Sequence, residues 1–199
     1  MVLYNCSVEG GFHRYFMKLD PVYFFKPFCN SPLFGIRIHS KFTAGRLVTH
    51  FPSMSLDIIK LEDSDIKLLC EMLGQSSASD KFEVHHLDCS FSATELLSGI
   101  RSLLYHEFNR NRMLFEGILT SLVALLVGGG VLEKKEVCLT IWDLVADSTF
   151  VEALNSLELP LIDILAELEP KFNVDVEFEL LTSGLACSLP SCSKFCVYT

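Results

Sequence analysis

The chain has 199 residues, of which half are hydrophobic, and a formal net charge of −9 at pH 7. This length and composition predict a single compact domain with a real core, and they exclude wholesale disorder. The acidic balance argues against a broad grip on nucleic acid, because such a grip depends on many Lys and Arg contacts to phosphates.

The N-terminal part of the chain is aromatic and more basic than the rest. Residues 1–50 carry a net charge of +4 and the remainder −13, which leaves a local anion site open beside the plainer interpretation of a solvated basic face. We expect an irregular segment over 1–19 and a first strand at 22–25. For residues 31–42 the pattern leaves a short helix and a strand open.

Three elements are predicted between Pro52 and the middle of the chain. An apolar run predicts a strand over 53–61. Apolar residues at helical spacing, after acidic and capping residues, predict a helix over 64–74. A weak alternation suggests a strand at 82–87, and a capping-box pattern at Ser92 and Glu95 predicts a helix from 93 to about 104.

The second half of the chain is expected to alternate between strands and helices. We predict strands at 112–118 and Val137–Leu144, and between them an apolar helix over 119–127 that three glycines stop. The uncharged run over 117–132 is shorter than the roughly 20 residues needed to span a bilayer, which favours a core segment.

The C-terminal part is predicted to hold two helices and a closing strand. Capping residues at 147–149 start a helix to about 157, and Pro160 and Pro170 bound the second helix. Strict alternation predicts a strand over 172–180. The Ser- and Cys-rich tail, 185–199, is expected to be loose.

Two short motifs within the predicted strands carry a resemblance to a known family. They are Ser53-Met54-Ser55 and Cys138-Leu139-Thr140, each with a hydroxyl residue two positions after a small residue. Their order along the chain resembles that of the two-histidine phosphoesterase superfamily, whose signature is a pair of His-x-Thr/Ser strands. Here both histidine positions hold other residues. The resemblance implies an α+β fold, two-lobed, with antiparallel sheets flanked by helices around a central cleft, over residues 20–184.

The resemblance also implies what the motif residues do. In active members one histidine is the general base and the other the general acid, which requires side chains that titrate near neutral pH. Ser53 and Cys138 are poor substitutes, whereas Ser55 and Thr140 would still hold phosphate oxygens. We therefore expect a catalytically impaired domain that binds RNA or a nucleotide phosphate without a metal or cofactor. If active, it would cleave a 2′,5′- or cyclic phosphodiester.

Three other kinds of chemistry compete with plainer interpretations of the same residues. Cys138 as a nucleophile paired with a histidine is much less common than a small core cysteine. His85 and His86 are adjacent, so on a strand they point to opposite faces and make a poor metal site. Trp142 is a candidate for base stacking, although core packing is the commoner use of a lone Trp.

Cysteine usage and the termini bear on the compartment. The eight cysteines include no C-x-x-C pair, and the start of the chain lacks the pattern of a secretory signal. We expect reduced thiols, a cytoplasmic or nuclear protein, and no transmembrane segment. The final four residues have the C-a-a-X form, so Cys196 is a weak candidate for lipidation.

Two alternative functions involve protein partners. Residues 56–66 and 84–94 share apolar and Ser positions at an offset of 28 residues, which is similar to a leucine-rich repeat and would indicate a protein-interaction domain. The apolar stretch 121–132 instead suggests a helical partner-binding domain of the apoptosis-regulator kind, which the predicted strand at 172–180 does not fit.

Overall fold

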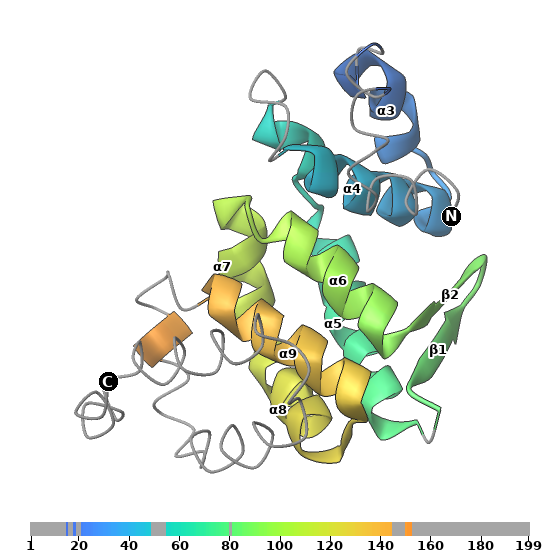
Figure 1. The fold of residues 1–199 in the computed structure, drawn as a ribbon. Coiled ribbons are helices and arrows are strands. Elements are labelled where there is room, and N and C mark those ends of the chain that lie inside the picture. The colour runs from blue at the N-terminus through green and yellow to red at the C-terminus, as the bar shows by residue number, and fades with distance from the viewer. Residues whose placement is uncertain are drawn as a thin grey trace. The chain divides into compact units, whose positions relative to one another are not determined.

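The computed structural model describes residues 15, 18, 21–48, 55–79, 81–144 and 150–152. Within these residues the chain is mostly helical, with seven α-helices, one 3-10 helix and one antiparallel two-stranded hairpin (Figure 1). The expected two-lobed α+β fold, with sheets around a central cleft, is therefore wrong. The chain divides into two compact units, Met1–Ile118 and Leu119–Thr199.

The first unit holds most of the described elements. In chain order they are α3 (Pro21–Cys29), α4 (Phe34–Val48), the 3-10 helix η1 (Leu56–Ile59), α5 (Asp63–Ala78), β1 (Glu83–His86), β2 (Cys89–Ser92), α6 (Ala93–Leu103) and α7 (Glu107–Phe115). Helix α8 (Ile118–Gly128) starts at the unit boundary, and α9 (Val131–Leu144) lies in the second unit.

Local sequence signals place α5 and α6 as expected. The Ser92 Oγ accepts a hydrogen bond from the Glu95 N–H, and a Glu95 carboxylate oxygen accepts one from the Ser92 N–H. This capping box confirms the predicted start of α6. The predicted helix over 64–74 is also confirmed, and it continues to Ala78. Its first turn carries Asp63 and Asp65, which the helix dipole favours at this end.

Helices α4 and α6 pack against each other, and small residues allow the contact. A Cβ added at Gly99 would lie 2.3 Å from the Phe42 ring, and one added at Gly45 would lie 2.4 Å from the Ser102 carbonyl oxygen. Phe42 is almost fully buried. The core of the first unit is therefore centred on a close crossing of two helices.

The hairpin is fixed to the start of α4. Its two-residue turn places Leu87 at a φ of 44°, and both carboxylate oxygens of Asp88 accept from the Gly35 N–H at 3.2 Å. The rings of Phe34 and His86 meet edge to face at 5.5 Å. The predicted strand at 82–87 is thus confirmed as β1, but its sheet has only the one further strand β2 within the described residues.

Several other predicted strands are helical. Residues 22–25 lie in α3, residues 112–115 end α7, and Val137–Leu144 forms the C-terminal part of α9. Of the expected strand over 53–61, the described part is η1 and three residues outside any helix or strand. The physical reason is that a short apolar run fits both the two-residue period of a strand and the 3.6-residue period of a helix. The buried residues of α9 repeat at helical spacing, namely Val137, Cys138, Thr140, Ile141 and Leu144.

The structure tests two more predicted helices, whereas the elements predicted near the C-terminus lie outside the described residues. The open choice over 31–42 is decided in favour of the helix α4, and the apolar helix over 119–127 is confirmed as α8. The second predicted helix near 160–170, the strand over 172–180 and the tail lie outside the described residues. No single helix among those described is long and apolar enough to span a membrane, although α7 and α8 pass such a test as a bent pair.

Candidate functional site

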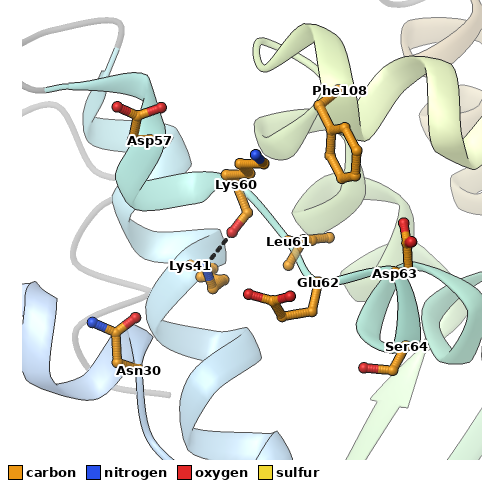
Figure 2. Close-up of a pocket in the computed structure, with 9 residues that line it drawn as sticks. All are labelled: Asn30, Lys41, Asp57, Lys60, Leu61, Glu62, Asp63, Ser64 and Phe108. Carbon is orange, nitrogen blue, oxygen red and sulfur yellow. Dashed lines mark hydrogen bonds between the residues drawn. The ribbon is translucent and has the colours of Figure 1, made fainter.

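A polar pocket of about 500 Å³ lies within the first unit (Figure 2). Its walls come from the end of α3, from α4, from the segment joining η1 to α5, and from the start of α7. The lining residues are Asn30, Lys41, Asp57, Lys60, Leu61, Glu62, Asp63, Ser64 and Phe108. Its volume falls within the range of clefts that hold small ligands.

Lys41 fixes one side of the segment between η1 and α5. Its side chain comes from α4 and is almost fully buried, with 5% exposed. The ammonium donates to the carbonyl oxygen of Ile58 at 3.3 Å and to that of Lys60, as the dashed line in Figure 2 shows. Burial lowers the pKa of this ammonium. Two of its three donors are thereby used by the backbone.

Asn109 holds the same segment from α7. Its Nδ2 donates to the carbonyl oxygens of Ile59 and Leu103 at 2.9 and 3.1 Å, and its Oδ1 accepts from the Leu61 N–H at 2.9 Å. The side chain is fully buried. The pocket therefore has a floor whose backbone groups are paired by two polar side chains from different helices.

A partly buried ion pair joins α4 to α5. The Arg37 guanidinium donates to both carboxylate oxygens of Asp65, at 2.8 and 2.7 Å, and to the Ser31 carbonyl oxygen at 2.6 Å. The hydrogen bond to Asp65 raises the pKa of Arg37. A bidentate pair of this kind orients both helices. The charged groups of Arg37 and Asp65 pair with each other and are therefore not available to bind a ligand.

The mouth of the pocket carries an excess of carboxylates. Asp57, Glu62 and Asp63 line it together with Lys60, while Lys41 is engaged below. The side chains of Asp57 and Asp63 are 87% and 64% exposed. His106 lies 3.9 Å from the Asp57 carboxylate, but burial lowers the pKa of its imidazole, so the ring is mostly neutral at pH 7. Carboxylates therefore outnumber the ammonium groups that line the pocket, three to two.

Helix α7 continues from the pocket as an exposed aromatic face. Phe108 and Phe115 are 38% and 77% exposed, and their spacing of seven residues puts them on one face. The Lys60 ammonium lies 4.8 Å from the Phe108 ring centre, and the Arg112 guanidinium 4.6 Å from that of Phe115. We call Phe108, Arg112 and Phe115 the α7 surface.

The charge of Arg112 is largely compensated. Its guanidinium meets a carboxylate oxygen of Asp63 at 3.1 Å and one of Glu116 at 2.9 Å. The α7 surface therefore exposes two aromatic rings without adding net positive charge. It borders the acidic mouth of the pocket, because Phe108 belongs to both.

The residues expected from the family resemblance are used locally. Ser55 is the N-cap of η1, where its Oγ accepts from the Asp57 N–H at 3.2 Å. Thr140 lies buried in α9 and donates to the Glu136 carbonyl oxygen at 2.7 Å. Ser55 belongs to the first unit and Thr140 to the second. The predicted strands that were to bring them to one cleft are not strands.

The other predicted site residues also find plain roles or lie outside the described residues. Burial in α9 raises the pKa of the Cys138 thiol to about 12, which keeps it protonated and a poor nucleophile. Trp142 is part of α9 and 40% exposed. Ser53 and Cys196 are outside the described residues, and within those that are described no group of His, Cys, Asp and Glu is placed to hold a metal.

Sequence reasoning did not find the residues that build the pocket. Lys41 and Asn109 stand in segments with no motif around them, and their roles depend on backbone groups 17 to 50 positions away. The one available signal was the seven-residue spacing of Phe108 and Phe115, which places them on one face of a helix. The prediction of a strand over 112–118 left no helix on which this spacing could be recognised. Comparison with protein-family models, curated proteins and solved structures finds no match for this chain.

Proposed function

We propose that this chain is a helical protein-interaction domain that binds its partner through the α7 surface. The single observation that carries the proposal is the pair of exposed or partly exposed aromatic rings, Phe108 and Phe115, that α7 carries seven residues apart. Scattered exposed apolar residues are ordinary, but aligned aromatic rings beside a pocket are typical of interaction sites. Aromatic residues and Arg also supply most of the binding energy at protein interfaces.

The charge of the pocket supports a protein partner over a phosphate. A phosphate group is held by unpaired cations and hydroxyl or backbone donors. Here three carboxylates line the mouth, Lys41 already serves two carbonyl oxygens, and Arg112 serves two carboxylates. Lys60 is then the one lining ammonium that could meet an anion. A nucleotide or RNA phosphate would meet the exposed carboxylates of Asp57 and Glu62 at this pocket.

Site-directed photocrosslinking tests the proposal on the full chain. A benzoylphenylalanine replacing Phe115 should give a discrete, light-dependent adduct with one protein, which mass spectrometry then identifies. The same group at Leu87, which is 94% exposed on the hairpin of the same unit, is the matched control and should not give that adduct. The purified partner should then bind the chain, and Phe115→Ala should weaken this binding by about tenfold. Adducts with nucleic acid alone, or identical adducts from both positions, would contradict the proposal.

A further inference from the structure

The α7 surface and the pocket beside it differ in chemistry, and together they define the kind of partner that fits. Phe108 and Phe115 lie about 10 Å apart along the helix axis, which is two turns of a helix. An amphipathic partner helix presents its own apolar residues at the same interval and can lay them along such a face. This accounts for the apolar half of the site.

The polar half is set by charges that remain accessible. Asp57 and Asp63 are largely exposed, and Glu62 stands at the N-cap of α5 without making a capping hydrogen bond. Asp57 accepts a hydrogen bond from the Ser55 hydroxyl and Asp63 meets Arg112, but the three carboxylates repel one another. An arriving cation would lower that repulsion. Carboxylates and an aromatic ring together suit a guanidinium, which forms paired hydrogen bonds with the former and stacks on the latter.

Lys60 shows that the Phe108 ring accepts a cation. Its ammonium already lies over the ring at 4.8 Å, on an exposed side chain. A partner guanidinium would replace this contact and would also reach the neighbouring carboxylates. The Lys60 ammonium therefore competes with a partner's cation for the Phe108 ring. Removing this ammonium should strengthen binding of a basic partner and weaken binding of an anionic one.

We propose that the α7 surface and its pocket bind a basic amphipathic segment of another protein, with apolar residues along Phe108 and Phe115 and an Arg or Lys side chain in the pocket. This inference rests on the proposed function and adds the partner's chemistry. The site lies wholly within the first unit, and its acidic groups are Asp57, Glu62 and Asp63, of which Asp63 also meets Arg112.

Fluorescence anisotropy with the purified full chain provides the test. The probes are two labelled helical peptides with Leu at identical positions i, i+3, i+4 and i+7, one with Arg and the other with Glu at the polar positions. The Arg peptide should bind at least tenfold more tightly, and added salt should reduce this difference. Equal binding of the two peptides would overturn the inference.

Variants locate the binding on the surface. Phe115→Ala should weaken binding of the Arg peptide by about tenfold, and Glu62→Gln should weaken it by about threefold. Lys60→Met should instead tighten binding of the Arg peptide by about threefold. Leu87→Ala removes an equally exposed apolar side chain from the hairpin and should change nothing. Circular dichroism confirms that each variant is folded. Binding that is unaffected by Phe115→Ala, or weakened by Lys60→Met, would refute the assignment.

Two further results would reassign the surface. Direct binding of a single-stranded RNA that Lys60→Met abolishes would assign the pocket to a nucleic acid. A dimer in sedimentation that Phe115→Ala dissociates would assign the α7 surface to a second copy of this chain. A photocrosslinked partner with an acidic segment would refute only the basic chemistry, whereas failure of both crosslinking and peptide binding would remove the proposed function as well.

Discussion

Two buried polar side chains organise the segment on which the pocket stands. Lys41 and Asn109 come from α4 and α7, and each pairs with backbone groups between Ile58 and Leu61. A chain that leaves a 3-10 helix and is not yet in the next helix has carbonyl and N–H groups that need partners. Lys41 and Asn109 therefore supply the hydrogen bonds that a helix or strand would otherwise make to these backbone groups.

Asn109→Ala should be among the most damaging single substitutions in the first unit. It removes three hydrogen bonds and leaves the Leu61 N–H and the Ile59 carbonyl without their partner. Because unpaired buried groups are costly, we expect the free energy of unfolding to fall by about 3 kcal/mol in urea denaturation. Asn111→Ala, at an exposed position of the same helix, is the control and should change it by less than about 0.5 kcal/mol. Similar changes in the free energy of unfolding for the two variants would show that the hydrogen bonds of Asn109 do not stabilise this segment.

Two histidines should make the fold sensitive to acid. Burial lowers the pKa of His39, which lies 4.6 Å from the Phe91 ring, and this outweighs the opposing effect of Glu95 and Asp88. Burial likewise lowers the pKa of His106. In the unfolded chain a histidine titrates near pH 6.5, so below that pH the unfolded state binds more protons than the folded one.

The free energy of unfolding should therefore decrease as the pH falls from about 6.5 towards the folded pKa values, and level off below them. Urea denaturation at several pH values between 5 and 7.5 measures this. His39→Phe keeps a ring against Phe91 but cannot take up a proton, so its stability should depend less steeply on pH. A pH dependence identical to that of the unchanged protein would exclude His39 as a contributor.

At the scale of elements, the α4 and α6 crossing decides the packing of the first unit. Gly45 and Gly99 let the two helices approach until side chains and backbone of one touch the other. The Ser102 hydroxyl, from α6, donates to the Phe42 carbonyl oxygen at 3.1 Å across the crossing. Such a contact has no room for an added methyl group.

Gly99→Ala should destabilise the protein by about 1–3 kcal/mol, because its Cβ would overlap the buried Phe42 ring. Gly128→Ala offers the opposite case, since a Cβ there meets nothing within 4 Å at the end of α8. It should stabilise by about 0.4–1 kcal/mol, because Ala lowers the entropy of the unfolded chain. Thermal unfolding of both variants tests the pair, and an equal loss of stability in both would show that the contact with Phe42 does not explain the effect of Gly99→Ala.

At the scale of the whole molecule, three of the four described cysteines, Cys29, Cys70 and Cys138, are buried core residues, and Cys89 is partly buried on the hairpin. Burial raises the pKa of Cys29 and Cys89 to about 11 and that of Cys70 and Cys138 to about 12. Thiols of this kind are protonated at neutral pH and react slowly. The fold itself therefore protects them.

Alkylation with iodoacetamide at pH 8 should be slow at all four of these positions. With the pKa raised by two units or more, the thiolate fraction falls by about 100-fold or more relative to the unfolded chain. Peptide-resolved mass spectrometry before and after adding denaturant follows each site separately. Fast labelling of Cys138 in the native protein would show that α9 does not bury it.

Sequence by itself determined those elements whose ends carry local chemistry. The capping box at Ser92, the acidic start of α5 and the glycines after α8 each act on the nearest backbone groups, so no distant contact is needed to read them. The strand β1 was likewise found from its own alternation.

Tertiary structure decided what short apolar runs become and which polar residues meet. Val137–Leu144 satisfies both a strand and a helix period, and packing selects between two local conformations of similar free energy. The pocket depends on contacts between residues up to 50 positions apart, such as Asn109 with Ile59. Such contacts leave no local pattern, because a hydrogen bond between distant residues constrains their positions in space and not their neighbours in sequence.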